Sequence, residues 1–371
     1  MILLTFIIGK TTILNQQACK GLPAKYVKTR VQTVTQINIS TVTKSSIEAR
    51  SSELSGSIVH TPVAPLHSPL ISSLIKECSV HLKLECLQHT GTFKARGALS
   101  VANQIPQPKR HLGITAASAG NHAIAAAWAA QQLDLSAKVV MQSSANPFRI
   151  ARARAHHAEV ILKPAGAATF GEAERLVEEE GRTFIHPFEG LDTTLGTAGV
   201  GLEFLKDVPE LDALVVAVGG GGLISGVAAA AKLIKPDCKV YGVEPIGAAS
   251  MSKSLKRGEP VTLKNTTTIA DSLAPPMALP FGYALCRNYV DEIVTVTDNE
   301  ICAGMAVLQE EAKLAVEPAA GAAMAAFLGP LRESMKNKRV GIVICGANID
   351  AQTYGDLLAR GRIAMADLLK S

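Results

Sequence analysis

Residues 89–98 read His-Thr-Gly-Thr-Phe-Lys-Ala-Arg-Gly-Ala, and the fold prediction starts from this stretch. It follows an apolar run at 80–84 that is typical of a strand. Lys94 therefore stands at a predicted strand-to-helix junction, directly after the aromatic Phe93. Desolvation there favours the neutral amine, which makes Lys94 a candidate covalent nucleophile. A lysine in the first turn of a helix is more often a solvated surface residue, so this interpretation depends on the motifs that follow.

A second motif, Ser-Ala-Gly-Asn-His at 118–122, lies between an apolar run at 112–116 and an alanine-rich stretch at 124–130. This order predicts a strand, a tight polar turn and a buried helix. Ser118 or Asn121 could act simply as a helix cap. Alternatively, backbone N–H groups at the helix start could bind an anion such as a substrate carboxylate.

Four successive glycines, Gly219, Gly220, Gly221 and Gly222, separate the apolar run 213–218 from an apolar, alanine-rich stretch that begins at Leu223. A run that is apolar throughout is typical of a strand buried on both faces. Backbone without Cβ atoms can approach a ligand closely, so we interpret the glycines as a phosphate-binding loop rather than a flexible linker. The glycines exclude a membrane helix, and their register does not match the dinucleotide-binding fingerprint.

The last motif is late in the chain. Glu317 opens the sequence Glu-Pro-Ala-Ala-Gly-Ala, and a predicted buried strand at 340–344 leads into Cys345. A cysteine of this kind is more often a core residue. At the carboxyl end of a parallel strand, however, its side chain would face the crevice where ligands bind in open α/β sheets.

A lysine nucleophile, a phosphate loop and a carboxylate-binding turn, all at strand ends, together indicate pyridoxal phosphate chemistry. The chain resembles the β-family, or fold-type II, of pyridoxal-phosphate enzymes, and within it the threonine/serine dehydratase and serine racemase branch. The resemblance covers about residues 58–350 and rests on four motifs in the family's order. It implies a two-lobed α/β fold with open, largely parallel sheets flanked by helices.

The resemblance also implies roles for particular residues. Lys94 matches the lysine that forms a Schiff base with pyridoxal 5′-phosphate, and Cys345 matches the residue that faces the pyridine nitrogen. The remaining cofactor contacts are expected from Phe93, Asn121, Gly219, Gly220, Gly221, Gly222, Leu223 and Glu317. The substrate carboxylate is expected at Ser118, Ala119, Gly120 and His122. Glu244 and Ala248 match positions of the racemases' divalent-cation site, but Ser250 replaces an expected carboxylate, so a cation is uncertain.

The implied reaction is β-elimination from a threonine- or serine-type β-hydroxy amino acid, with Lys94 as the base at Cα and a 2-oxo acid and ammonia as products. Alternatives are dehydration of 3-hydroxyaspartate or phenylserine, serine racemisation, and a non-catalytic protein that binds the cofactor. Racemisation needs a second acid/base where Ala119 stands, and alanine cannot transfer a proton. The resemblance further implies a homodimer or homotetramer with a small-molecule amino-acid substrate.

Composition is consistent with such an enzyme. The net charge of +5 comes from residues 1–47, which contain six basic residues and no acid; the remainder holds 31 basic and 32 acidic residues. Nothing therefore argues for a nucleic-acid partner or a membrane. The basic start resembles a transit peptide or a disordered extension, so the expected location is cytoplasmic, mitochondrial or plastid. We expect its removal to leave the enzyme folded.

We predict three regions along the chain. They are the extension 1–47, a large lobe at 48–111 plus 190–371, and a small inserted lobe at 112–189. The strands are expected at 81–87, 112–116, 138–142, 159–163, 183–187, 213–218, 239–244 and 340–344. The helices are expected at 93–103, 124–130, 147–157, 172–180, 192–208, 223–231, 299–313, 318–328 and 353–369, with Asp192 or Thr193 capping the helix at 192–208.

Overall fold

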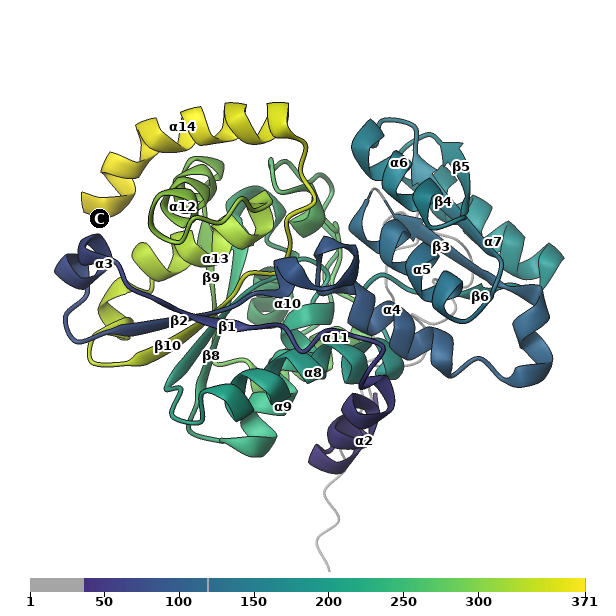
Figure 1. The fold of residues 1–371 in the computed structure, drawn as a ribbon, viewed down its shortest axis with the longest axis horizontal. Coiled ribbons are helices and arrows are strands. Elements are labelled where there is room, and N and C mark those ends of the chain that lie inside the picture. The colour runs from purple at the N-terminus through teal and green to yellow at the C-terminus, as the bar shows by residue number, and fades with distance from the viewer. Residues whose placement is uncertain (1–36, 119, 371) are drawn as a thin grey trace, which may run out of the picture.

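The computed structural model describes residues 37–118 and 120–370, and it contains two open sheets that lie side by side with helices around them (Figure 1). The larger sheet has the order β1-β2-β10-β7-β8-β9, and only β1 is antiparallel to its neighbour. The smaller sheet has the order β5-β4-β3-β6 and is parallel throughout. The predicted α/β class with largely parallel, helix-flanked sheets is confirmed.

The larger sheet is built from β1 (Val63–Leu66), β2 (Ser79–Lys83), β7 (Ala213–Ala217), β8 (Lys239–Pro245), β9 (Glu292–Val296) and β10 (Arg339–Val343). The smaller sheet is built from β3 (Ile114–Ser118), β4 (Ala137–Gln142), β5 (Glu159–Lys163) and β6 (Thr183–Phe184). The helices are α2 (Lys44–Leu54), α3 (Pro69–Leu74), α4 (Lys94–Asn103), α5 (Asn121–Gln132), α6 (Pro147–Ala155), α7 (Ala167–Glu180), α8 (Leu191–Asp207), α9 (Gly222–Ile234), α10 (Ser250–Arg257), α11 (Pro280–Tyr289), α12 (Asp298–Glu311), α13 (Pro318–Leu328) and α14 (Ala351–Lys370).

Two buried elements explain why the larger sheet forms. Every residue of β7 is buried, as its β-branched and apolar sequence predicts for a central parallel strand. Every residue of α13 is buried as well, and its small alanines and glycine allow close packing on β7 and β8. Helix α4, which begins with Lys94, packs against both α5 and α8 and so lies between the two sheets.

The first residues that the structure describes correct one expectation. The prediction that the segment 1–47 lies apart from the body is wrong for residues 37–47. Val42 and Ile47 are 2% and 1% exposed and pack in a cluster with Leu195 and Leu285. The sequence of α2 has only isolated apolar residues, so its buried side could not be recognised from periodicity. The earlier part of the extension, 1–36, lies outside the described residues.

A second correction concerns helix α8. It begins at Leu191 with Gly190 as its N-cap, so neither Asp192 nor Thr193 caps it. Asp192 instead accepts a hydrogen bond from Arg50 of α2 at 2.9 Å. The predicted lobe boundaries near residues 112 and 189 stay a prediction. Within the described part of the chain, no helix combines the length and apolar character needed to cross a membrane.

Candidate active site

Lys94 is the first residue of α4, and its surroundings combine burial with nearby acidic groups. The amine donates a hydrogen bond to the Pro187 carbonyl and lies 5.1 Å from the centre of the Phe93 ring. Although the residue keeps some surface exposure, desolvation lowers the pKa of Lys94 to about 8, while Glu317 and Cys345 act in the opposite direction. A substantial fraction of the amine is therefore neutral near neutral pH.

The glycine loop joins β7 to α9 and presents unsatisfied backbone donors. Gly220, Gly221 and Gly222 are buried, and among the described residues no acceptor is found for their N–H groups. Gly221 has φ of +93°, a conformation that favours glycine. Buried N–H groups without partners are rare in folded proteins, so this loop has the properties of an anion site. Backbone donors of this kind are what a phosphate group requires.

Phe188 covers this loop closely. A Cβ atom on Gly220 would lie 2.4 Å from the Phe188 ring, and one on Gly222 would lie 2.7 Å from the Phe188 Cα. The next residue, Glu189, accepts hydrogen bonds from the N–H groups of Phe281 and Gly282, at 2.6 and 3.1 Å. Burial raises the pKa of Glu189 to about 7. No motif in the sequence identified these residues, because only the tertiary fold brings 188–189 onto the glycines.

Asn121 and Glu317, which are 196 positions apart in the chain, form one hydrogen-bonded unit. The Asn121 amide donates to both Glu317 oxygens at 2.9 and 2.8 Å, and its carbonyl oxygen accepts from Asn348 at 3.0 Å. Burial raises the pKa of Glu317, although Arg149 and Asn121 partly oppose this effect. The unit joins α5 to the residues that precede α13 and follow β10.

Cys345 lies two residues after β10 and is 2% exposed. Its carbonyl accepts a hydrogen bond from the Phe93 N–H at 3.1 Å, so it is a direct neighbour of the residue before Lys94. Burial raises the pKa of the Cys345 thiol well above its usual value, and Glu317 adds to this effect. The thiol is therefore a neutral group at physiological pH.

The predicted carboxylate turn is partly described. Ser118 accepts a hydrogen bond from the Gly120 N–H at 3.0 Å, while Ala119 lies outside the described residues. The His122 imidazole donates to the Ile185 carbonyl at 2.7 Å, and burial lowers the pKa of His122 to about 3. The His122 side chain is therefore neutral and already engaged. A small enclosed pocket beside Lys94 is lined in part by Lys94, His122, His186 and Gly222.

The structure does not bring every predicted residue to this pocket. Glu244 uses both carboxylate oxygens at the start of α10, where Met251 and Ser252 donate at distances between 2.6 and 2.8 Å. Ala248 is buried beside this helix start and has no side-chain donor. Over the described ranges, no three His, Cys, Asp or Glu side chains are arranged to hold a metal ion. Glu244 and Ala248 therefore form no such group, and a divalent cation stays an open possibility from the resemblance.

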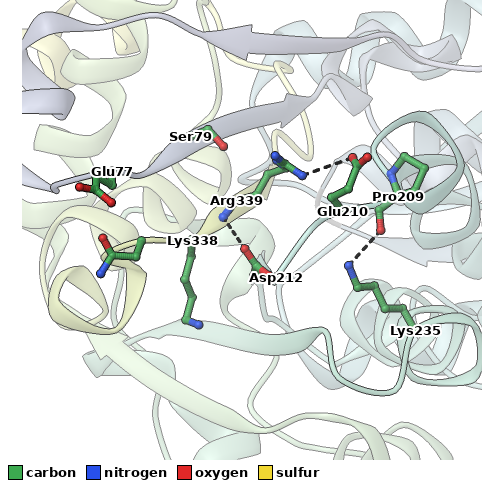
Figure 2. A pocket seen from close by; sticks show the side chains of 9 residues that line it. Glu77, Ser79, Pro209, Glu210, Asp212, Lys235, Lys338 and Arg339 are labelled. Atoms are coloured by element: carbon green, nitrogen blue, oxygen red, sulfur yellow. Dashed lines mark hydrogen bonds and ion pairs between the residues drawn. The ribbon is translucent and has the colours of Figure 1, made fainter.

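A larger cavity lies away from Lys94, near the residues that begin β2 and β10 (Figure 2). It has a volume of about 410 Å³ and charged side chains around it. Three acidic and three basic side chains line it; Arg339 pairs with Glu210 at 3.3 Å, and the Asp212 carboxylate accepts from the backbone N–H of Arg339 at 2.7 Å. No predicted site residue lines it, so the candidate active site is the pocket at Lys94.

Comparisons with known proteins point to the same chemistry. The family described as pyridoxal-phosphate dependent enzyme matches residues 54–346. A phenylserine dehydratase from Ralstonia pickettii is 47% identical over 283 residues, which cover 76% of this chain and 87% of that protein. An L-threonine ammonia-lyase from Thermotoga maritima is 38% identical, with 79% of this chain and 73% of that protein covered. The solved structure of maize serine racemase superimposes with a TM-score of 0.79 at 31% identity, covering 85% of this chain and 98% of that one.

Proposed function

This chain belongs to the pyridoxal-phosphate-dependent enzyme family, and on that premise we propose that it removes water from a β-hydroxy amino acid to give a 2-oxo acid and ammonia. The observation that carries the proposal is Lys94, whose amine has a pKa lowered to about 8 and lies beside the glycine loop and the pair of Asn121 and Glu317. The relatives described as a dehydratase and an ammonia-lyase support the same reaction class.

The cofactor of the family is pyridoxal 5′-phosphate, which supplies a carbonyl for covalent capture of an amine and an electron-withdrawing ring that acidifies the Cα proton. We infer that the N–H groups of Gly219 to Leu223 bind its phosphate and that Asn121 contacts the ring substituents. The neutral Cys345 thiol would face the ring nitrogen. Because a thiol with a raised pKa is a weaker acid than an aspartic acid, it would not keep that nitrogen protonated.

Lys94 has two tasks in this proposal. Its neutral amine would hold the cofactor, which would supply a carbonyl carbon for covalent attachment, and the amine would be free once the substrate amino group is attached in its place. The freed Lys94 amine then removes the proton from the substrate Cα as a general base. The β-hydroxyl leaves with a proton as water. The released enamine tautomerises and is hydrolysed by one water to the 2-oxo acid and ammonia, so that no net water is consumed.

The side chain of the substrate is the finer part of the proposal. We place phenylserine first, because the 47% identical relative is described as a phenylserine dehydratase, and threonine, serine and 3-hydroxyaspartate after it. Serine racemisation is the second candidate, favoured by the similarity to maize serine racemase. Ala119 provides no proton donor for the opposite face of Cα, so elimination should exceed racemisation. We include a homodimer or homotetramer in the proposal, which sedimentation would test.

The deciding experiment measures 2-oxo acid and ammonia from a panel of these four amino acids, with D-serine formation from L-serine measured in parallel. We expect equimolar products from at least one substrate and none from the variant Lys94→Ala. The exposed Lys109 provides the matched control, and Lys109→Ala should retain native turnover. D-serine as the main product would replace the proposal with racemisation, and no product from any substrate would reject it.

A further inference from the structure

Arg149, on helix α6, lies directly against the predicted carboxylate turn. A Cβ atom on Gly120 would be 2.4 Å from Arg149 Cδ, 3.0 Å from Nη1 and 3.1 Å from Nε. The absence of a side chain at position 120 therefore leaves room for the arginine. Only 7% of Arg149 is exposed, and Asn146 fixes the start of α6 by donating to Asp350 at 2.6 Å. A buried cation thus lies on the backbone of the turn.

The hydrogen bonds of Arg149 leave one part of the guanidinium free for a ligand. Nε donates to the Asn348 carbonyl at 3.1 Å, and Nη1 donates to the Asp271 carboxylate. For Nη2, no acceptor exists among the residues that the structure describes. Burial disfavours the charge on Arg149, but Asp271 outweighs it and raises the pKa of the guanidinium.

Asp271 differs from its partner in exposure. Half of its side chain is exposed, against 9% for Arg149. Its carboxylate bonds to Arg149, and no other hydrogen bond of this side chain is found within the described residues. Solvent can therefore hydrate the carboxylate if it leaves Arg149. The buried guanidinium would then keep the Coulombic effect of Glu317 and Asp350 but lose its hydrogen-bonded carboxylate, which favours another anion in that place.

We propose that Arg149 binds the α-carboxylate of the amino-acid substrate and that Asp271 is its exchangeable counterion in the free enzyme. Arginine presents its N–H groups in a planar fork that matches a carboxylate. Asn348 holds Nε in place while Nη1 and Nη2 receive the substrate. This inference rests on the proposed function only in taking an amino acid as the ligand, and it does not depend on which bond the enzyme breaks.

Two roles of the Arg149–Asp271 pair predict different results: Asp271 is displaced by the substrate, or the salt bridge only stabilises the fold. If the pair only stabilises the fold, removing either partner should weaken substrate binding through the same loss of order. If the substrate replaces Asp271, the two substitutions should change the substrate affinity in opposite directions. Arg149→Gln removes the cation that the substrate needs, while Asp271→Asn removes the anion that competes with it.

The test uses the holoenzyme and two ligands that cannot undergo β-elimination. L-Alanine carries an amine and a carboxylate but no β-hydroxyl, and ethylamine carries the amine alone. Calorimetry should show that Arg149→Gln weakens the binding of L-alanine by about tenfold or more, as expected for a lost charge-assisted hydrogen bond. The affinity for ethylamine should stay unchanged. Asp271→Asn should strengthen the binding of L-alanine by roughly threefold to tenfold. Arg149→Lys should recover part of the affinity that Arg149→Gln loses.

Glu210→Gln is the matched control, because it removes a carboxylate paired with an arginine at the distant cavity (Figure 2) and should leave both affinities unchanged. Three outcomes would overturn the inference: weaker L-alanine binding by Asp271→Asn, an equal loss of ethylamine binding in Arg149→Gln, or no L-alanine binding by the native enzyme. If Arg149→Gln fails to fold, the sign of the Asp271→Asn effect still decides. If the variants show the expected changes in L-alanine and ethylamine affinity but the enzyme produces no 2-oxo acid, the proposed function is rejected and this inference stands.

Discussion

At the scale of single residues, opposing electrostatic effects set the pKa of Lys94. Desolvation removes the stabilisation that water gives to an ammonium ion, while Glu317 and Cys345 favour the charged form. Desolvation is the larger effect, so the pKa falls from 10.5 to about 8. The neutral fraction at pH 7.5 is then roughly one quarter, against about one part in a thousand for an ordinary lysine.

This difference predicts the pH dependence of Lys94 chemistry. Because the pKa is lowered, the proton is lost earlier on raising the pH, and amine reactivity should rise through a midpoint near 8 and level off above about pH 9. Pulse labelling of the cofactor-free protein with acetic anhydride, followed by mass spectrometry of the peptide that contains Lys94, measures this midpoint. The exposed Lys109 is the internal reference. A midpoint for Lys94 above pH 9.5 would contradict the expected desolvation.

Sequence reasoning selected Lys94, Asn121 and Glu317 as candidate site residues, because each lies in a short motif at a predicted element boundary. The structure brings Lys94, Asn121, Glu317 and Cys345 into one hydrogen-bonded and electrostatic neighbourhood. Arg149 and Asp271 could not be found in the same way. They are 122 positions apart, so only the tertiary fold shows that they form a pair and that Arg149 lies against Gly120.

At the scale of elements, the glycine loop tolerates side chains poorly for a reason that differs along its length. A methyl group on Gly220 would meet the Phe188 ring, which can rotate, whereas one on Gly222 would meet the Phe188 backbone, which cannot. We therefore predict that Gly222→Ala costs about 1–3 kcal/mol of folding stability and weakens cofactor binding more than Gly220→Ala does. Urea unfolding and a titration with pyridoxal phosphate provide the measurements.

Gly171, in the exposed part of α7, is the matched control for these substitutions. No atom lies within 4 Å of its Cβ position, so Gly171→Ala should raise stability by up to about 1 kcal/mol through helix propensity. If Gly222→Ala binds the cofactor as tightly as the native protein does, the close approach of Phe188 to the loop is wrong.

Helix α2 provides a second prediction at this scale. Ile47 is 1% exposed against α8 and α9, so Ile47→Ala should destabilise the protein by about 2–4 kcal/mol. The exposed Ser45→Ala in the same helix should change stability little. Thermal unfolding compares the two variants. A native melting temperature for Ile47→Ala would support the original expectation that this segment is separate from the body.

The elements predicted with exact bounds are those whose sequence marks both the type of element and its ends. Strand Glu159–Lys163 and helix Pro318–Leu328 were both predicted in full, the helix because proline opens it and glycine follows it. Strands β1 and β9 and helices α2, α3, α10 and α11 were not predicted. Helix α10 has only two large apolar residues, Met251 and Leu255, and α2 is similarly polar, so tertiary contacts rather than periodicity fix such elements.

At the scale of the whole molecule, a buried ion network joins the larger sheet to the helices around Lys94. Arg96 of α4 pairs with Glu85 at 2.8 Å and with Glu203 of α8 at 2.7 Å. Lys83 of β2 pairs with Glu203 at 2.8 Å and donates to the Thr61 carbonyl at the same distance. Two cations and two anions with little or no exposure balance each other, so the network is costly to break at any member.

The position of Arg96 gives the network a consequence for the site. It lies two residues after Lys94 on the same helix, so the ion pairs with Glu85 and Glu203 fix the start of α4 relative to α8 and β2. The fold therefore holds Lys94, the proposed nucleophile, through buried charges rather than through apolar packing alone.

The final prediction concerns Glu203, which contacts both cations. Glu203→Gln leaves Lys83 and Arg96 with one anion fewer in a buried site, and the expected loss is about 3–5 kcal/mol in urea unfolding at pH 7. Burial raises the pKa of Glu203, but Arg96 and Lys83 outweigh it and lower the pKa below its usual value. The ionised Glu203 carboxylate therefore stabilises the fold fully above its unfolded-state pKa of about 4.3. This stabilisation is lost as the pH falls through the lower pKa of Glu203 in the folded protein. Acid unfolding of the variant should consequently show a shallower dependence on pH below 5 than that of the native protein. Glu333→Gln, which removes an exposed partner of Lys336, should leave both curves unchanged. A Glu203→Gln variant within 1 kcal/mol of the native stability would mean that the network does not hold α4 in place.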